Sequence, residues 1–375
     1  MWRERGRLLI CMWRRHLNRN GLVRIGLRLK YLWAYVLYYM RRPKRPIETY
    51  NQIHLISSLR VYAGGQLRTL HLFEELKNHA EVTLWSEHEV NSEFSKKYTV
   101  KRIVPERFEF PVTGTFVFVG VWFSISPWLR YTYPRRIIVV HNSDMSPARF
   151  SQKLRQLSNG GRRKVEVAYA SELMKSLVNY PGIIQPSLID LDRFVPSVSN
   201  PSDSTSANFT VGRLSRSISY KHHQDDGALY RQLVDYGCRV RIMGPSRSLK
   251  AELDGLESVT LLSELAQEAH LFLQGLDCFF YRTSEEFLEP SARVVTEAMA
   301  CGLPIVCHNR GGYTEYIHHG QNGFLFDTQQ EALEILLRLK EDRRLRERIG
   351  KAARETAEEL FSSARRADIV EFYLR

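Results

Sequence analysis

Short apolar runs alternate along most of the chain with longer stretches in which apolar residues recur at helical spacing. In the first half, the stretch 67–79 places Leu67, Leu70, Phe73 and Leu76 on one side of a predicted helix. The apolar runs around it predict strands at 53–57, 82–85, 115–120, 136–141 and 165–170. Because buried strands that alternate with helices form parallel βαβ units, we expect an α/β fold with a doubly wound sheet.

A second series of the same kind follows a polar, Ser- and Pro-rich stretch at 199–207, which predicts a linker. The strands expected in this series lie at 209–213, 239–244, 259–262, 278–282, 304–308 and 323–326. The helices expected between and after them lie at 228–237, 263–275, 292–302, 313–320 and 330–360. The chain therefore predicts two Rossmann-like domains, 47–198 and 208–375, that face a crevice suited to two substrates. The last helix is a candidate to pack back on the first domain.

Length and composition agree with this organisation. A chain of 375 residues fits two domains, and 43% hydrophobic with 25% charged residues excludes wholesale disorder. The five cysteines are odd in number and form no C-x-x-C pair. This pattern argues against a disulfide framework or a cysteine zinc site and is typical of a reducing compartment.

The net charge of +13 is concentrated in residues 1–46. This segment holds 13 Lys and Arg and a single acid, Glu4, and so carries +12, whereas the rest of the chain carries only +1. An enzyme that works on nucleic acid carries basic residues along its working cleft. We therefore expect no nucleic-acid partner.

Residues 1–46 predict a basic amphipathic segment that lies on a membrane surface. Their most apolar run, 31–40, has ten residues between basic flanks and is too short to span a bilayer, and no secretory cleavage site follows it. Trp, Tyr and Arg side by side are typical of a helix in the headgroup layer of an anionic membrane. The alternative is a helix packed on the protein's own surface. We expect a cytoplasmic protein, peripheral on the inner face of the membrane.

Two features of the first half lie beyond the carboxyl ends of strands, where doubly wound sheets bind ligands. Gly64-Gly65 falls between the first strand and its helix, where backbone amides can face an anion. A plain tight turn is the alternative. His141 ends the strand 136–141, which favours a side chain that points toward the crevice. The alternative is a histidine that caps the loop after it.

The most informative stretch runs from Glu289 to Phe326. Glu289 and Glu297 are separated by seven residues, and a helix that starts near Ser291 places one in the preceding loop and the other two turns into the helix. Carboxylates accept hydrogen bonds from paired hydroxyls, and free amides at a helix start suit a phosphate. The two acids could therefore hold a sugar and a ribose. The alternative is a surface helix with two solvated acids.

This E-x7-E spacing, followed by AMACGLPIV and GG-x-x-E, resembles the retaining GT-B glycosyltransferases of family 4, the group 1 glycosyltransferases. The resemblance covers roughly residues 50–360 and is strongest in the C-terminal half. Its other segments are IIVVHNS, IIQPSLIDLDRFVP (183–196), FTVGRLSR (209–216) and NGFLF (322–326).

The resemblance implies catalytic roles for four residues. Arg213 and Lys221 would hold the donor diphosphate and offset the charge of the leaving group. Their separation is eight residues, whereas the family has five or six, so Arg216 is a substitute for Lys221. Glu289 would bind the donor sugar, and His141 would hydrogen-bond the same sugar.

The resemblance also implies the remaining donor contacts. Glu297 would bind the ribose hydroxyls. The backbone at Ala292, Arg293 and Val294 would lie against the phosphate or the sugar. Gly64 and Gly65 are candidate donor contacts by their position after the first strand. Pro290-Ser291-Ala292 stands where the family carries Gly-Phe-Gly or similar, so the hexose contacts are expected to differ.

Several acidic and histidine pairs resemble metal ligands but lack complementary spacing. Asp190-Leu191-Asp192 spells the D-x-D motif of another glycosyltransferase fold, yet it falls in the interdomain connection, and we interpret it as structural. The other pairs are expected in solvated loops: Asp225-Asp226, His222-His223 and His318-His319. We expect no metal and no cofactor, with a UDP- or GDP-sugar as substrate.

The sequence thus predicts a metal-independent, retaining glycosyltransferase. It would move a hexose from a nucleotide sugar to a lipid-linked or membrane-proximal glycan acceptor, in the synthesis of surface polysaccharide or glycolipid. One alternative is a nucleotide-sugar epimerase of the same fold, which needs an added base in the crevice. Another is a non-catalytic GT-B partner, against which the presence of Arg213, Glu289 and Glu297 counts.

Overall fold

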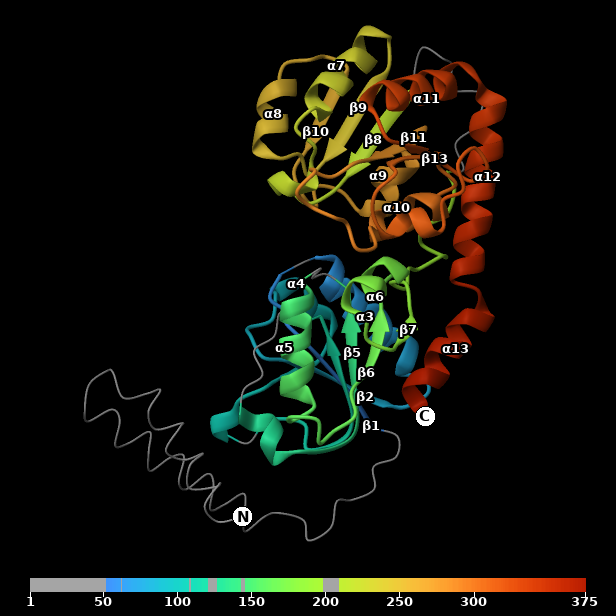
Figure 1. The fold of residues 1–375 in the computed structure, drawn as a ribbon. Coiled ribbons are helices and arrows are strands. Elements are labelled where there is room, and N and C mark those ends of the chain that lie inside the picture. Colours follow the sequence, from blue (N-terminus) through green and yellow to red (C-terminus); the bar gives the residue numbers. More distant parts are fainter. Residues whose placement is uncertain (1–51, 62, 108, 121–126, 143–145, 198–208) are drawn as a thin grey trace, which may run out of the picture.

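The computed structural model describes residues 52–61, 63–107, 109–120, 127–142, 146–197 and 209–375 (Figure 1). The predicted membrane-surface segment 1–46 and the predicted linker 199–207 lie outside these described residues. Within them, no helix combines the length and the apolar character needed to cross a bilayer.

The first domain is built on a parallel sheet of seven strands in the order β3-β2-β1-β4-β5-β6-β7. β1 lies at the centre, between β2 and β4, so the connection reverses direction there and opens a crevice at the carboxyl ends of the strands. Its strands are β1 (Gln52–Ser57), β2 (Glu81–Ser86), β3 (Val100–Arg102), β4 (Thr113–Val119), β5 (Tyr133–His141), β6 (Glu166–Tyr169) and β7 (Ile183–Ile184). Its α-helices are α3 (Gly64–Leu76), α4 (Ser92–Lys97), α5 (Pro147–Leu157) and α6 (Glu172–Val178), with 3-10 turns η1 (Pro105–Arg107) and η2 (Pro127–Tyr131).

The second domain repeats this plan with six parallel strands in the order β10-β9-β8-β11-β12-β13. The strands are β8 (Thr210–Leu214), β9 (Arg239–Met243), β10 (Val259–Leu262), β11 (Cys278–Tyr281), β12 (Ile305–His308) and β13 (Phe324–Phe326). The helical elements are η5 (Ser219–Lys221), α7 (Asp226–Asp235), α8 (Arg247–Leu253), α9 (Ala269–Gln274), α10 (Arg293–Ala300), η6 (Gly312–Glu315), α11 (Gln329–Glu341) and α12 (Arg343–Leu360). Apolar side chains cover both faces of this sheet, as the near-continuous apolar strands require.

Three predicted helices differ from the observed ones. The helix predicted at 263–275 is only α9, and the one at 313–320 is only the turn η6, because the side chain of Asn322 bonds to the backbone of His318 and Tyr316 and holds a loop there. The long helix predicted at 330–360 is two helices. Asp342 breaks it, since its side chain accepts the amide of Leu345 at 2.9 Å and caps the start of α12.

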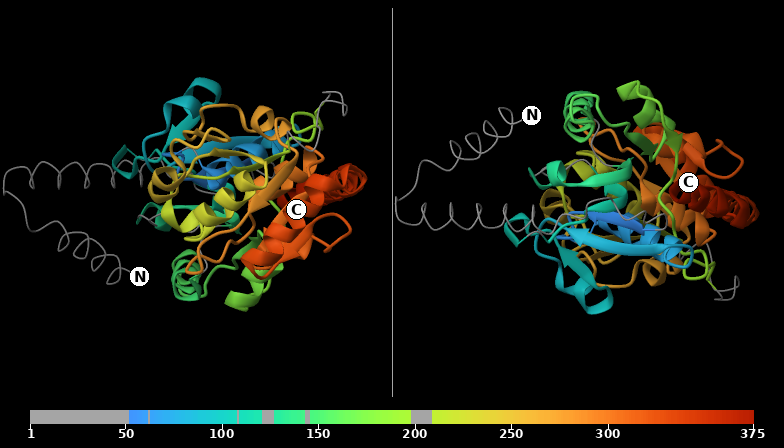
Figure 2. Two further views of the ribbon diagram at one scale, coloured as in Figure 1. Left: turned by 90° about the horizontal axis from the view of Figure 1, so that it is seen from above. Right: turned by 90° about the horizontal axis from the view of Figure 1, so that it is seen from below.

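The last helix, α13 (Ser363–Leu374), lies against the first domain, and Figure 2 shows α12 and α13 (red) along one side of the molecule. Val370, Phe372 and Tyr373 are buried in the same core as β1 and β4. Arg136 on β5 donates from Nη1 to the carbonyl of Phe372 at 2.9 Å. The chain therefore passes between the domains twice, once in each direction.

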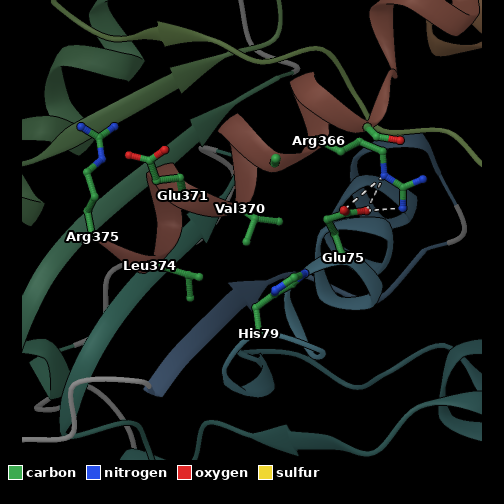
Figure 3. Close-up of a pocket in the computed structure, with 9 residues that line it drawn as sticks. Glu75, His79, Arg366, Val370, Glu371, Leu374 and Arg375 are labelled. Atoms are coloured by element: carbon green, nitrogen blue, oxygen red, sulfur yellow. Dashed lines mark hydrogen bonds and ion pairs between the residues drawn. The ribbon is translucent and has the colours of Figure 1, made fainter.

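The contact between α13 and α3 leaves an open groove of about 620 Å³ (Figure 3). Arg366 and Glu75 form an ion pair at one side of it, with Nη2 and Oε2 2.6 Å apart, and Val370 and Leu374 line its floor. This groove lies toward the carboxyl end of α3, whereas the crevice between the domains lies toward the amino end.

Candidate active site

The carboxyl ends of the two sheets meet across the crevice. α6 begins just after β6 in the first domain, and η6 begins just after β12 in the second; these two elements are in contact. A Cβ atom added to Gly312 would lie 2.8 Å from the Cβ of Ser171, so the two backbones approach as closely as glycine permits. Residues that follow the strands of both domains can therefore act on one ligand.

On the first-domain side, Gly64 and Gly65 form the first residues of α3 rather than an isolated turn. The preceding residue, Ala63, gives no side-chain cap, so the amides at the helix start are free of that competitor. A Cβ on Gly65 would lie 3.6 Å from Nδ2 of Asn142, and one on Gly120 would lie 3.6 Å from Oδ1 of the same side chain. The loops after β1, β4 and β5 thus converge on Asn142.

Asn142 is a residue that sequence reasoning did not single out. Its Oδ1 is buried and accepts no hydrogen bond from the described residues, although a buried acceptor normally has a partner. Its position in the sequence could have indicated a role at the site, because Asn142 directly follows His141 at the same strand end. An amide oxygen in this position could accept a hydrogen bond from a sugar hydroxyl.

His141 lies deeper than the sequence suggested. Its side chain is fully buried, and its ring stacks on Phe150 with centroids 4.4 Å apart. Tyr169 packs edge-on against it at 5.9 Å. Its predicted hydrogen bond to the transferred sugar therefore stays a prediction, because in this structure α5 and β6 cover the imidazole.

Arg213, at the end of β8, is also fully buried. Its Nη2 donates to the carbonyl oxygen of Lys221, and its guanidinium lies 4.9 Å from the ring centre of Tyr281. Burial opposes its charge, but the carboxylate of Asp226, 3.7 Å from Nη1, together with Tyr230 and Tyr281, outweighs this effect, and the pKa of Arg213 is raised. Arg213 is thus a permanent cation that holds the backbone of Lys221 in place.

Asp226 and His222 correct the expectation of solvated loops. Both are buried, because Asp226 accepts two hydrogen bonds from Arg282, at 2.8 and 3.0 Å, and balances Arg213. Nε2 of His222 lies 3.1 Å from Oγ of Ser215. Burial, with Arg213 nearby, lowers the pKa of His222 to about 4. His318 and His319 are exposed, as expected.

Lys221 reaches the predicted sugar-binding acid directly. Its ammonium forms an ion pair with Oε2 of Glu289 and lies 4.6 Å from the ring centre of Phe287. The hydroxyl of Tyr281 donates to the same oxygen of Glu289 at 2.7 Å. Burial and the Glu289 carboxylate raise the pKa of Tyr281, so its phenol remains a donor. Arg216, by contrast, is exposed and makes no side-chain hydrogen bond or ion pair with the described residues.

The longer spacing between the two predicted phosphate cations therefore has a structural explanation. The 3-10 turn η5 takes up the extra residues, and the amide of Lys221 donates to the carbonyl of Ile218 at 3.0 Å. This turn returns the chain to the crevice at Lys221. The geometry brings Lys221, and not Arg216, together with Glu289.

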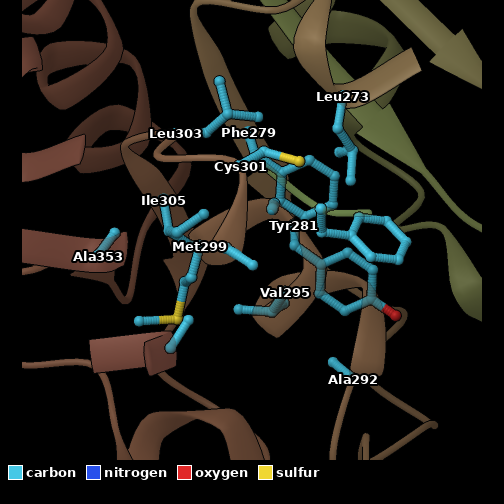
Figure 4. Close-up of a cluster of buried hydrophobic side chains, with 14 of the residues drawn as sticks. Leu273, Phe279, Tyr281, Ala292, Val295, Met299, Cys301, Leu303, Ile305 and Ala353 are labelled. Atoms are coloured by element: carbon cyan, nitrogen blue, oxygen red, sulfur yellow. The ribbon is translucent and has the colours of Figure 1, made fainter. Parts of the chain in front are cut away.

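Glu297 lies in the second turn of α10, which begins at Arg293, two residues later than expected, because Ala292 has a left-handed conformation with φ of 40°. Ala292 gives no side-chain cap, so the amides at Arg293 and Val294 are open to a ligand. Figure 4 shows Ala292 and Val295 beside Tyr281, whose hydroxyl lies at the rim of the apolar cluster below α10.

Arg293 and Glu297 form a buried pair one turn apart. Nε of Arg293 donates to Oε1 of Glu297 at 2.7 Å, and the two side chains are 10% and 7% exposed. Burial raises the pKa of Glu297, and Arg293 offsets part of this effect. Nη1 of Arg293 is buried and makes no hydrogen bond with the described residues. The side chain of Arg293, which the sequence predicted only as a backbone contact, thus orients Glu297.

Comparison with solved structures identifies the architecture. HepE of Anabaena, in complex with UDP and glucose, superposes with a TM-score of 0.67 at 19% identity, over 86% of this chain and 98% of that chain. The protein has the GT-B fold. Its two parallel sheets belong to the two Rossmann-like domains of that fold (Figure 1).

The sequence comparisons point to the same class. Residues 209–356, most of the second GT-B domain, match the family of glycosyl transferases group 1. Spore coat protein SA of Bacillus subtilis is 42% identical over 88 residues, 23% of each chain. Sucrose synthase 2 of Pisum sativum is 25% identical over 329 residues, which cover 79% of this chain and 40% of that protein. The matched region spans less than half of the length of each of these curated relatives. Membership of family 4 in particular stays a prediction.

The candidate site combines cations with the carboxylates of Glu289 and Glu297. Among the described residues, no three His, Cys, Asp or Glu side chains are grouped as metal ligands. Asp190 of the D-x-D segment uses Oδ1 to accept the amides of Asp192 and Arg193, at 3.1 and 3.2 Å. It therefore stabilises a turn in the connection between the domains.

Proposed function

We propose that the protein is a retaining glycosyltransferase that moves a hexose from a UDP- or GDP-sugar to a lipid-linked or membrane-proximal glycan acceptor. The observation that carries the proposal is the contact of Lys221 and Tyr281 with one oxygen of Glu289, beside the start of α10. In this proposal Lys221 is the cation that binds the phosphate, Glu289 is the carboxylate that binds sugar hydroxyls, and the uncapped start of α10 adds free amides beside them. Arg213 supports this group by its hydrogen bond to the backbone carbonyl of Lys221.

The proposed chemistry places the largest demand on the leaving group. The bond between the anomeric carbon and the diphosphate oxygen breaks, a bond to the acceptor oxygen forms, and the acceptor proton leaves with the diphosphate. Fixed positive charge next to the diphosphate stabilises the transition state more than the ground state. Lys221 supplies this charge from the turn η5, and the open amides at the start of α10 add to it.

Glu289 would bind the hydroxyls of the donor sugar. Its Oε2 is held by Lys221 and Tyr281, while Oε1 accepts no hydrogen bond from the described residues. Donor binding would share the ammonium of Lys221 between the diphosphate and this carboxylate. Glu297, oriented by Arg293, would bind the ribose one turn further along α10. Asn142 and the start of α3 would face the sugar from the other domain.

Two observations support the choice of substrates. Structures of HepE, which shares the GT-B fold, contain UDP and UDP-glucose, which makes UDP-sugars the first donors to test. The charge of +12 in residues 1–46 supports an acceptor at an anionic membrane surface, because each basic residue near such a surface adds about 1 kcal/mol of attraction. Transfer at the inner face of a membrane, in the synthesis of surface polysaccharide or glycolipid, would use both features.

The proposal is tested with a panel of UDP-, GDP- and ADP-sugars. A specific donor should raise the melting temperature by mass action, and release of its nucleoside diphosphate should then require an acceptor. Anomeric NMR of the product should show the configuration of the donor. Conversion of the free nucleotide sugar to its epimer would instead support the epimerase alternative. Stabilisation by none of the nucleotide sugars would contradict the proposal.

A further inference from the structure

A carboxylate of the second domain binds the backbone of the first. Glu315, at the end of η6, accepts the amide of Leu173 with Oε1 at 2.8 Å and the amide of Glu172 with Oε2 at 3.0 Å. These amides open α6, whose side-chain cap, Ser171, is already engaged with the amide of Met174 at 3.2 Å. Two amides that point the same way fit the two oxygens of one carboxylate, and the helix start favours its charge.

The first-domain end of this contact is tied to the predicted catalytic histidine. The amide of Ala170, immediately before Ser171, donates to the carbonyl of His141 at 2.9 Å. Ser171 itself is 1% exposed and leaves little room for adjustment. A shift of the start of α6 therefore shifts the strand end that carries His141 and Asn142.

The second-domain end is tied to the predicted sugar-binding acid. The amide of Gly312 donates to the carbonyl of Glu289 at 2.9 Å. A Cβ on Gly312 would lie 1.9 Å from the carbonyl oxygen of Pro290, so this turn must carry glycine to lie against the loop of Glu289. Gly311 has φ of 133°, a conformation that also favours glycine. Only two residues, Tyr313 and Thr314, separate Gly312 from Glu315.

We propose that Glu315 is a positioning residue, an interdomain latch that fixes Glu289 relative to His141 and Asn142. This inference rests on the proposed transfer reaction. The carboxylate of Glu315 links two short stretches of backbone. One leads to the loop that carries Glu289, and the other leads to the strand end that carries His141 and Asn142. Formation of the latch places the groups of both domains around one donor sugar, and release of the latch separates them while each domain stays folded.

The latch is tested with Glu315→Gln and Glu315→Ala in the full chain. Gln has nearly the same size as Glu but offers only one acceptor oxygen. Its side-chain NH₂ group would therefore face one of the two backbone N–H groups, and that hydrogen bond would be lost. Glu334→Gln on α11 is the matched control, because within the described part of the chain the Glu334 side chain bonds only to Gln330 of its own helix, at 2.8 Å. Thermal denaturation of each variant checks that both domains remain folded.

We expect kcat for transfer to fall about tenfold in Glu315→Gln, the size of a typical coupling between two sites. The Kd of the bare nucleoside diphosphate, measured by calorimetry, should stay within about twofold, because its contacts lie in the second domain. Glu315→Asp keeps the charge and should recover part of the rate. A loss of nucleotide affinity that parallels the loss of kcat, or no change in kcat, would overturn the latch.

Hydrogen exchange separates failure of the latch from failure of the proposed reaction. The amides of Glu172 and Leu173 should exchange faster in Glu315→Gln than in the parent and in Glu334→Gln, whether or not a donor has been found. Unchanged exchange at these two amides would refute the contact itself. Faster exchange in a protein that transfers no sugar would keep the contact and refute its catalytic purpose.

Discussion

Replacement of Lys221 by Met tests the central assignment of the site. Met has an unbranched apolar side chain like the stem of Lys and removes the ammonium that lies over the Phe287 ring and pairs with Glu289. The side chains of Lys221 and Glu289 are 18% and 7% exposed. Loss of one fixed donor at a developing charge costs about 10²–10³ in kcat. The guanidinium of Arg213 stays in place, because Asp226 and the backbone carbonyl of Lys221 hold it. The substitution leaves both partners unchanged.

The same change has a cost in stability that must be kept apart from the kinetic effect. Glu289 would retain only the hydrogen bond from Tyr281, and a partly buried charged group that loses one partner destabilises by about 1–3 kcal/mol. Activity is therefore measured well below the melting temperature of the variant, as release of nucleoside diphosphate at saturating donor.

Arg216→Met is the matched control, because Arg216 is an exposed cation on the same loop. It should change kcat by less than about twofold, since an exposed charge that makes no pair contributes little. Lys221→Arg should retain part of the rate. Full activity in Lys221→Met together with a large loss in Arg216→Met would refute the reasoning and transfer the role to Arg216.

Four further outcomes are expected. Glu297→Gln should weaken nucleotide binding by about tenfold in calorimetry, whereas Glu289→Gln should mainly lower kcat; equal losses of binding would contradict this division. His54 and His222 both have a pKa lowered to about 4 by burial, so each remains neutral in the fold, and the free energy of unfolding should fall by about 1–2 kcal/mol per histidine between pH 7 and 5. Denaturant titration at both pH values checks this, and His222→Gln should flatten the dependence. Transfer should continue in EDTA, and a strict need for Mg²⁺ would contradict the proposed chemistry. The full chain should sediment with anionic liposomes and be partly released by salt, whereas a variant that begins at Ile47 should not sediment; equal sedimentation would place the anchor elsewhere.

The sheets were predictable because apolar runs that alternate with helices have few other solutions. Every strand predicted in the second half is present, and neighbouring strands are parallel, as their alternation with helices predicted. Helix ends were less predictable, because they depend on single residues: Asp342 divides a continuous helical pattern, and a left-handed Ala292 delays the start of α10. Neither effect has a signature in apolar spacing.

The positions of site residues could be predicted where they belong to motifs that occur in a fixed order along the chain. They could not be predicted where they depend on contacts between distant segments. Glu289 lies in the loop before α10, as the spacing predicted, and Glu297 lies in the second turn of that helix, nearer to its start than predicted. The burial of Asp226 follows from two arginines that reach it from β8 and the end of β11, far away in sequence. The sequence showed Glu315 only as the last residue of the GG-x-x-E motif. Its interdomain contact could not be predicted, because its partners are backbone amides 142 and 143 residues away.

The return of α13 to the first domain has a consequence for how the protein is made. Val370, Phe372 and Tyr373 complete a core that also includes residues of β1, β2, β4, β5 and α3, so the domain that emerges first from the ribosome lacks part of its interior until translation has passed residue 373. Domains usually fold in the order of their synthesis. Here the second domain can close its own core before α13 is made, whereas the first domain keeps part of its apolar core uncovered until α13 packs on it.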